Sequence, residues 1–392
     1  MSRVLLGNDV LLREHLSEIQ GKRLGLVANV ASVTGDLVPL HLVLQKHPRL
    51  ALTKLFSPEH GFQTTVQDAL PVPDAKDPAT NLPVYSLYGK AKAPTPKMLK
   101  GIDLLLFDLQ DAGLRFYTYL STLYYCLQAC ARAKVPVIVL DRPNPLAGAR
   151  VQGPMLQSRF SSFLGVAQLP LRHGMTLGEL ALYLNAVQAL RAKLKVIPMK
   201  GWMRGMWFDQ TGLAWVPPSP NLPSFDSTLA YPATCLIEGT NLSEGRGTPR
   251  PFEQIGAPWV DPAGLTYDLN ALGLGGVRFS PATFTPTRDK HRGRICFGVE
   301  VDLTDRKRFD PIATGVGLLK VLLKTYPDKF FWRKEGRRFF IDLLLGTDLI
   351  RKVLEEGKTA SGLRNPEAAT TTRFLERRKK FLLYKVIATR SF

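Results

Sequence analysis

The sequence predicts an α/β protein, a Rossmann-like doubly wound parallel sheet followed by a second, smaller α+β domain at the C-terminal end. In the first half, short apolar runs alternate with helix-like segments, and each run ends in polar residues. A proline-rich connector then precedes a tail with a different pattern. Because 392 residues exceed the usual size of one domain, we expect a Rossmann-like catalytic domain at residues 1–230 and a smaller domain at 231–392 that contributes to the same cleft.

Four apolar runs predict the buried strands of the sheet: Arg23–Asn29, Leu52–Ser57, Ile102–Asp108 and Val135–Asp141. Helices are expected between them at Leu37–His47 and at Thr118–Lys134, where apolar side chains recur along one helical face. Strand, helix and strand in this order predict parallel strands covered by helices. Cys126 and Cys130 would share one face of the second helix and lie buried as small apolar residues.

The connector Trp215–Pro223 holds four prolines in nine residues, which predicts an extended, non-helical segment. The tail beyond it alternates strand-like and helix-like patterns. Strands are expected at Gly276–Phe279, Arg294–Leu303 and Phe339–Ile341, and helices at Asp310–Lys324 and Phe374–Leu383.

Composition limits the classes of function. Hydrophobic residues make up 45% of the chain and charged residues 22%, as in ordinary globular proteins. The formal net charge of +19 favours an anionic partner, but no nucleic-acid module accompanies it, so no specific nucleic-acid partner is predicted. No apolar run approaches the roughly 20 residues of a membrane span. The N-terminus carries charges where a signal peptide needs apolar residues, which predicts a cytoplasmic protein, or a periplasmic or extracellular one if a leader has been removed.

Signatures of metal and cofactor sites are missing from the sequence. It contains no HExxH, EF-hand loop or CxxC spacing, so we predict neither a metal nor a disulfide framework. It also lacks GxGxxG and GxxxxGK[ST], which argues against a nucleotide site, and GxSxG, which argues against an α/β-hydrolase. No cofactor and no oligomeric state are predicted.

The polar residues that end the predicted strands mark a candidate site. They are Asn29, Glu59 with His60, Asp111 and Asp141. In open parallel sheets, ligands bind beyond the carboxyl ends of the strands, so we expect these side chains at one edge. A carboxyl group beside an apolar Phe at a cleft suits general acid catalysis, which favours Glu59, although a loop Glu also pairs readily with a basic residue.

Two neighbouring segments add candidates. Arg115 and Tyr117 follow Asp111 in one strand-to-helix turn, where Arg115 could grip a substrate carboxylate; in the alternative, Asp111 pairs with Arg115 and Thr118 caps the helix. His173 precedes a helix that begins near Thr176, and is assigned either to the substrate or to a structural role.

Thr176 and Glu179 form a plausible capping box for that helix. Further along, the segment Glu238–Thr248 has three glycines and almost no apolar residues, which predicts a polar loop outside the core. Asn241, Glu244 and Arg246 would offer sugar-binding groups there, or the loop is simply flexible.

Seven ordered motifs resemble one family, the exo-β-N-acetylmuramidases or NamZ-like glycosidases, formerly a domain of unknown function. The motifs are SPEHGF (Ser57–Phe62), LPVYSLYG (Leu82–Gly89), DLQDAGLRFYTYLSTL (Asp108–Leu123), LDRPNPLAG (Leu140–Gly148), LRHGMTLGELA (Leu171–Ala181), WVPPSPNLP (Trp215–Pro223) and YPATCLIEGTNLSEGRGTPRPFEQIGAPW (Tyr231–Trp259). Two segments, Val27–Ser32 and Gln63–Asp68, depart from the family's usual pattern at the predicted cleft. The resemblance implies release of N-acetylmuramic acid from the non-reducing ends of peptidoglycan oligosaccharides or muropeptides, in cell-wall turnover or recycling.

The resemblance also implies roles for the candidate residues. Glu59 becomes the general acid/base with His60 beside it, and the second catalytic group is Glu244, Asp111 or the substrate's own 2-acetamido oxygen. Arg115 or Arg246 would bind the lactyl carboxylate of muramic acid. The expected substrate-binding set is completed by Asn29, Tyr117, Asp141, His173 and Asn241. The alternative is a non-catalytic protein of the same fold that binds cell-wall glycan.

Overall fold

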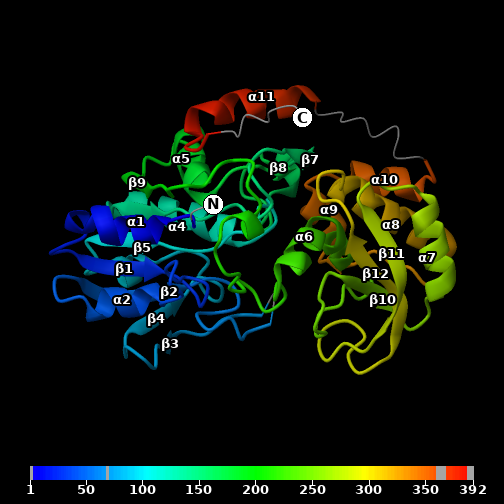
Figure 1. Cartoon of the computed structure of the whole chain (residues 1–392), viewed down its shortest axis with the longest axis horizontal. Helices are drawn as coiled ribbons and strands as arrows, with labels where there is room; N and C mark the ends of the chain where they lie inside the picture. The colour runs from blue at the N-terminus through cyan, green and yellow to red at the C-terminus, as the bar shows by residue number, and fades with distance from the viewer. Residues whose placement is uncertain (1–2, 68–69, 359–367, 386–392) are drawn as a thin grey trace. The chain divides into compact units, whose positions relative to one another are not determined.

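The computed structural model describes residues 3–67, 70–358 and 368–385. Contacts divide the chain into two compact units (Figure 1). Unit 1 comprises the described residues of Met1–Val151, His173–Pro220 and Phe374–Phe392, and unit 2 those of Gln152–Arg172 and Asn221–Arg373. The domain boundary expected near residue 230 stays a prediction.

Unit 1 is built on a seven-stranded sheet with the order β3-β4-β2-β1-β5-β6-β9. Its strands are β1 (Arg23–Val27), β2 (Ala51–Ser57), β3 (Ala75–Lys76), β4 (Pro83–Ser86), β5 (Leu104–Phe107), β6 (Val137–Leu140) and β9 (Leu194–Ile197). All neighbours pair in parallel except β3 and β4. Counted in chain order, the six parallel strands stand as 3-2-1-4-5-6, which is the Rossmann order with its switch point between β1 and β5. The predicted fold class is therefore confirmed.

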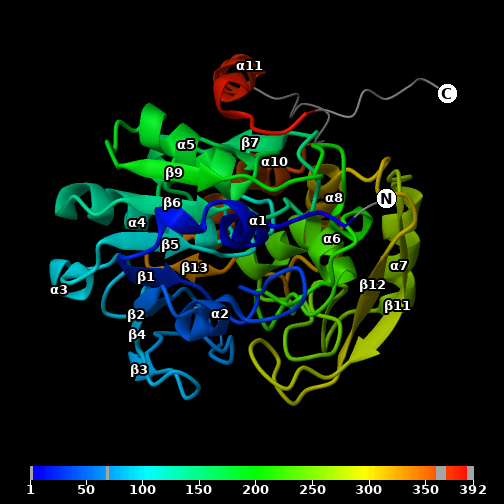
Figure 2. The same cartoon turned by 60° about the vertical axis from the view of Figure 1, so that its left-hand side comes forward.

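Helices cover both faces of this sheet. They are α1 (Gly7–Glu14), α2 (Leu40–Lys46), α3 (Pro96–Leu99), α4 (Tyr119–Ala133) and α5 (Leu177–Val187). Val10 and Leu11 of α1 and Leu40 and Leu44 of α2 join the alternate strand residues that form one core layer. Helix α4 packs against α3 and α5, and Figure 2 shows the strands between α3 and α4 on one side and α1 and α2 on the other. Cys126 and Cys130 lie buried in α4, as expected.

Unit 2 contains a three-stranded antiparallel sheet with the order β10-β12-β11, against which helices α7 and α6 pack. Its elements are β7 (Gln152–Met155), β8 (Pro170–Arg172), α6 (Phe225–Thr234), β10 (Gln254–Ala257), α7 (Pro262–Ala271), β11 (Val277–Phe284), β12 (Cys296–Leu303), α8 (Pro311–Thr325), β13 (Lys334–Glu335), β14 (Arg338–Phe339), α9 (Phe340–Leu345) and α10 (Leu349–Glu355). Antiparallel strands with covering helices confirm the predicted smaller α+β part of the fold. Within the described residues, no helix is long and apolar enough to cross a membrane.

The predicted elements agree with the structure wherever an apolar run is buried on both sides. The predicted strand Phe339–Ile341 is wrong, because only Phe339 is in a strand and Phe340 begins α9. That apolar run continues into Leu343–Leu345. The residues form a helix instead of a strand, and all six residues of α9 are buried. The connector Trp215–Pro223 holds neither helix nor strand, as its prolines predict.

The last described segment, Phe374–Lys385, returns to unit 1. It forms the end of α11 (Ala368–Arg378) and a short 3₁₀ turn at Lys379–Phe381. Phe374 and Phe381 both contact the ring of Tyr183 on α5. Two further contacts hold the segment against the rest of unit 1. Arg378 donates to the backbone oxygens of His173 and Gly174, and Tyr384 packs edge-on against Trp202. The predicted helix Phe374–Leu383 thus begins earlier and ends sooner than expected.

Candidate active site

The carboxyl edge of the unit 1 sheet carries the polar residues predicted for the site. Asn29 follows β1, Glu59 and His60 follow β2, Asp111 follows β5 and Asp141 follows β6. These four strands are neighbours in the order β2-β1-β5-β6 and all are parallel. The structure therefore brings the five predicted residues to one edge, but their side chains have different partners.

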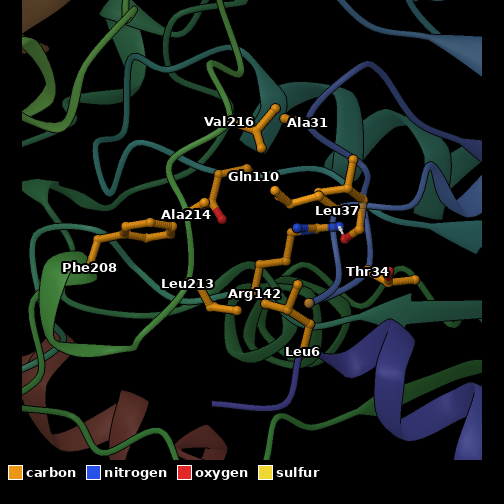
Figure 3. Close-up of a pocket in the computed structure, with 12 residues that line it drawn as sticks. Leu6, Ala31, Thr34, Leu37, Gln110, Arg142, Phe208, Leu213, Ala214 and Val216 are labelled. Carbon is orange, nitrogen blue, oxygen red and sulfur yellow. Dashed lines mark hydrogen bonds between the residues drawn. The ribbon is translucent and has the colours of Figure 1, made fainter. Parts of the chain in front are cut away.

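At the switch point between β1 and β5, the chain's own residues occupy the space. The carboxylate of Asp108 pairs with Arg142, with Nε at 2.6 Å and Nη2 at 3.0 Å, and both side chains are buried. Arg142 also donates to the backbone oxygen of Val33 at 2.7 Å. This guanidinium lies in a small pocket of about 20 Å³. Figure 3 shows it among mostly apolar side chains such as Leu37 and Phe208. Because its charge is already paired, this pocket offers little to an ionic ligand.

Asn29 fastens the proline-rich connector to the sheet. Its side-chain nitrogen donates to the hydroxyl of Tyr119 at 2.9 Å and to the backbone oxygen of Pro218 at 3.0 Å. Its side-chain oxygen accepts from the backbone of Ala31 at 3.0 Å, and Tyr119 also donates to Pro218. These hydrogen bonds satisfy the buried side chain of Asn29 within the protein. The substrate contact expected for Asn29 stays a prediction.

Glu59 lies in the turn after β2 with 7% of its surface exposed. Its Oε2 accepts a hydrogen bond of 2.6 Å from the hydroxyl of Thr118. Thr118 occupies the N-cap position of α4, yet its side chain makes no capping bond. The carboxylate therefore sits at the positive end of a 15-residue helix, oriented by the hydroxyl that would otherwise serve as a cap.

A cation stands near this carboxylate. Partial burial lowers the pKa of Lys92, while the charge of Glu59 acts in the opposite direction. The Lys92 ammonium lies 3.2 Å from the ring centroid of Tyr88, a cation–π arrangement just beyond β4. The edge of β4 thus adds a positive group and an aromatic face to the surroundings of Glu59.

His60 connects the same turn to the connector. It has a left-handed backbone, with φ of 69°. Its Nδ1 lies 2.9 Å from the backbone oxygen of Val66, and its Nε2 lies 3.1 Å from the hydroxyl of Ser219. Because a carbonyl only accepts, Nδ1 carries a proton, and Nε2 shares a hydrogen bond with the Ser219 hydroxyl. In this arrangement His60 holds the turn that presents Glu59.

Asp111 and His173 form a second buried pair. Asp111 Oδ2 accepts from the backbone nitrogen of Gly113 at 2.8 Å and lies 3.6 Å from His173 Nε2. His173 Nδ1 accepts from the backbone nitrogen of Met175, so the proton of the neutral ring is on Nε2 and points to the carboxylate. Asp111 Oδ1 is buried and has no hydrogen-bond partner. The catalytic role expected for Asp111 and the substrate contact expected for His173 stay predictions.

Arg115 and Tyr117 lie in the turn between β5 and α4. Arg115 has no exposed surface, and Tyr117 is buried with its ring 4.7 Å from that of Tyr119. A carboxylate in solution reaches a guanidinium enclosed in this way only if neighbouring residues move. The substrate-binding roles of both residues remain predictions.

Asp141 is fully buried and its hydrogen bonds connect β6, α5 and the returning C-terminal segment. Its Oδ2 accepts from the hydroxyls of Thr176, at 2.7 Å, and Tyr384, and its Oδ1 accepts from the backbone of Gly178 at 2.8 Å. Burial raises the pKa of Asp141 to about 7, against hydrogen bonds that lower it. The capping box of Thr176 and Glu179 is confirmed. The contacts of Asp141 are structural, and its expected contact with substrate stays a prediction.

In unit 2, the predicted residues Glu244 and Arg246 belong to a buried ionic network. Glu244 Oε1 lies 2.8 Å from Arg246 Nε, and its Oε2 lies 2.7 Å from Lys290 Nζ. Arg246 also donates to Glu238 at 2.5 Å. Each carboxylate thus faces a cation, which is how charged groups are tolerated in an interior.

The prediction that Glu238–Thr248 lies outside the core is wrong. Glu238 to Thr240 and Leu242 to Arg246 are buried, and Glu238 lies in the last turn of a 3₁₀ helix, Cys235–Gly239. The polar sequence is buried because its charges neutralise one another. Asn241 is partly exposed, and its side chain bonds the backbone of Lys329 and Phe331. Among the described residues, no group of three or more His, Cys, Asp or Glu side chains could hold a metal.

Sequence reasoning missed three residues around Glu59. Thr118 was interpreted as a helix cap, Ser219 was part of the connector, and Lys92 was not considered. Each lies in or near a motif already noted, since Lys92 follows the LPVYSLYG segment and Ser219 lies within WVPPSPNLP. Their closeness to these motifs in the sequence is the signal that could have indicated them. Which side chains they contact is visible only in the folded structure.

Comparisons with known proteins identify relatives over nearly the whole chain. The family model described as exo-beta-N-acetylmuramidase NamZ, N-terminal, matches residues 24–226, and its C-terminal counterpart matches residues 229–384. The peptidoglycan beta-N-acetylmuramidase NamZ of Bacillus subtilis (strain 168) is 45% identical over 382 residues, covering 97% of this chain and 92% of the relative.

Two solved structures from Bacteroides fragilis NCTC 9343 are also similar, each described as a DUF1343 family protein. The first is 35% identical with a TM-score of 0.90 and covers 98% of this chain and 99% of its own. The second is 31% identical with a TM-score of 0.75 and covers 98% of this chain and 100% of its own. The fold described above is therefore shared with experimentally determined structures.

Proposed function

The chain belongs to the exo-β-N-acetylmuramidase NamZ family, and from that premise we propose that it is a glycoside hydrolase that releases N-acetylmuramic acid from the non-reducing ends of peptidoglycan fragments. The relative at 45% identity carries the substrate class in its name. A muropeptide or a short peptidoglycan oligosaccharide is the corresponding substrate.

Glu59 is the proposed general acid/base, and its hydrogen bond with Thr118 is the observation that carries this assignment. Cleavage of a glycosidic bond requires a proton on the leaving oxygen, and then a base for the attacking water or for the next step. A carboxylate at a sheet edge, with one oxygen fixed by a hydroxyl, presents its other oxygen in a defined direction. His60 and Ser219 hold the turn below it.

The second catalytic group is proposed to be a carboxylate or the substrate's acetamido oxygen. Asp111, with Oδ1 lacking a hydrogen-bond partner and Oδ2 held by Gly113, is the candidate within unit 1. Product stereochemistry distinguishes the mechanisms: retention fits a nucleophile about 5–5.5 Å from the acid or a neighbouring acetamido group, and inversion fits a base about 6.5–9.5 Å away. Proton NMR of the freshly released sugar reads the anomer directly.

The test of the proposed function is release of N-acetylmuramic acid from a MurNAc-GlcNAc disaccharide and from a chromogenic β-MurNAc glycoside. Wild type should turn over both, and Glu59→Gln should lose turnover while it keeps its circular dichroism spectrum and melting temperature. Absence of turnover by a folded wild-type protein that still binds the glycan would instead identify a non-catalytic glycan-binding member of the family.

A further inference from the structure

A second pocket of unit 1, of about 160 Å³, opens beside the turn that carries Glu59. It lies between the end of β2 and the segment around β3. Four apolar side chains contribute to its lining: Phe62, Val66, Val72 and Val84. Ser57, two residues before Glu59, and Asp77 add polar groups. The pocket is larger than the one at the switch point and adjoins the proposed catalytic turn.

Two buried polar atoms of this lining have no hydrogen-bond partner: the hydroxyl of Ser57 and Oδ1 of Asp77. Ser57 is 1% exposed and Asp77 is 2% exposed. Buried polar groups are nearly always satisfied in native proteins, and each exception needs an explanation. Two exceptions lining one pocket are accounted for together by a ligand that hydrogen-bonds to both.

The carboxylate of Asp77 is fixed so that only one oxygen is open. Its Oδ2 accepts from the backbone nitrogen of Thr80 at 2.9 Å and from the hydroxyl of Thr80 at 2.6 Å. The imidazole of His41 lies 3.8 Å from the same Oδ2; burial lowers its pKa, and the charge of Asp77 acts in the opposite direction. Oδ1 therefore remains an acceptor for a donor from the pocket.

The lining thus combines the unpartnered Asp77 oxygen and Ser57 hydroxyl with an apolar wall, and His60, Gln63, Thr65 and Lys76 add further polar groups. An acetamido group has the complementary set: its N–H donates to Asp77, its carbonyl accepts from Ser57 and its methyl packs on the valines. At the open oxygen of Asp77, a neutral acetamido N–H is favoured over a carboxylate, which the Asp77 charge repels. A single water molecule, which takes up about 30 Å³ in the liquid, does not fill a space of this size.

We propose that this pocket binds the acetamido group of an N-acetylated amino sugar. The inference rests on the proposed function, because it names the part of the substrate that this edge of the sheet recognises. The pocket would select N-acetylated sugars over analogues that carry a hydroxyl in place of the acetamido group, while the lactyl carboxylate is bound elsewhere.

The first experiment compares binding of N-acetylmuramic acid and 3-O-lactylglucose, in which a hydroxyl replaces the acetamido group, by isothermal titration calorimetry. Wild type should bind the acetylated sugar about tenfold more tightly, the scale of one net hydrogen bond together with a buried methyl. Ser57→Ala, and Val66→Phe, which fills the pocket, should reduce this preference to nearly onefold. Equal binding of both sugars by wild type would overturn the proposal.

Matched controls separate loss of the pocket from loss of structure. Thr53→Val removes a hydroxyl from the same strand, one that donates to the backbone of Leu24, and Val187→Phe adds a ring at an exposed position of α5. Both should keep the preference. Retention of the preference by Ser57→Ala and Val66→Phe, with unchanged melting temperatures, would also contradict the inference.

A measurement on wild type alone keeps the proposal testable if the variants fail to fold. In saturation-transfer NMR, the acetamido methyl of N-acetylmuramic acid should receive more saturation than its lactyl methyl, and the reverse ranking would reject the pocket as the acetamido site. Failure of the proposed function is distinguishable, since it appears as absent turnover of the disaccharide whatever the sugar preference.

Discussion

Glu59 in unit 1 and Glu244 in unit 2 are both buried carboxylates predicted to act in catalysis, but their partners differ. Glu59 Oε2 accepts from a neutral hydroxyl, that of Thr118. Glu244 is held between two cations, with Arg246 at 2.8 Å and Lys290 at 2.7 Å. Lys92 also acts on Glu59 through its charge, whereas Glu244 lies within ion-pair distance of both of its cations. We therefore propose proton transfer for Glu59, which the Thr118 hydroxyl orients, and a structural ionic role for Glu244.

The largest expected effect is on the rate. Glu59→Gln should lower kcat/KM by about 10²–10⁴-fold, the usual contribution of general acid–base catalysis, with little change in stability. Steady-state hydrolysis of the chromogenic glycoside measures it. Glu14→Gln, which alters an exposed carboxylate paired with Lys200 in the same unit, should keep wild-type kinetics. Equal activity of Glu59→Gln and wild type would remove Glu59 from the reaction.

Glu244→Gln should mainly affect stability. It removes the anion that faces Lys290 and one of those that face Arg246, which keeps Glu238, and breaking a buried pair typically costs about 3 kcal/mol or more. Urea unfolding should show this loss in the free energy of unfolding. Glu356→Gln, which removes an exposed partner of Lys358, should change it by less than about 1 kcal/mol. If Glu244→Gln keeps full stability but loses turnover, the assignment of roles is reversed.

Thr118→Val sharpens the comparison by removing the neutral donor to Glu59 while keeping the shape of the side chain. A hydrogen bond to a charged group is worth about 1.5 kcal/mol, so kcat should fall about tenfold and the pH–rate profile should move. Thr118→Ser retains the hydroxyl and should restore both. A melting temperature that drops while the pH–rate profile stays fixed would mean that Thr118 is only structural.

The last expected effect concerns Asp141, whose pKa burial raises from 3.8 to about 7. The folded state then binds more protons than the unfolded state between about pH 4 and 7, so this residue's contribution to stability falls as pH rises through that window. Asp141→Asn should remove that slope in urea unfolding followed across pH. Asp103→Asn is the matched control, because Arg23 lowers the pKa of Asp103 to about 2 and the change should appear only below about pH 4, with opposite sign.

The strands of unit 1 were predictable because parallel strands are buried on both faces and leave continuous apolar runs. Strand β9 was missed because Lys195 interrupts a run of only four residues. Phe339–Ile341 was mistaken for a strand because a short apolar run has no period that distinguishes strand from helix. The buried polar segment in unit 2 was misplaced for a related reason, since composition does not reveal that charges will meet partners such as Lys290.

The edge on which the candidate site lies was also predictable, because polar residues at the ends of parallel strands mark it. The contacts within it were not. Thr118 is 59 residues from Glu59, Ser219 is 159 from His60, and Tyr384 is 243 from Asp141. No periodicity links positions so far apart, so only the fold reveals which side chains meet.

The discontinuous path of unit 1 has a consequence for how the protein is made. Its described residues come from three stretches of the chain, and the last stretch supplies Tyr384 to Asp141 and to the backbone of Met199. During synthesis, which adds about 5–20 residues per second, Asp141 emerges long before its partner. The hydrogen bond between Tyr384 and Asp141 can therefore form only after most of unit 2, which lies between them in the sequence, has left the ribosome.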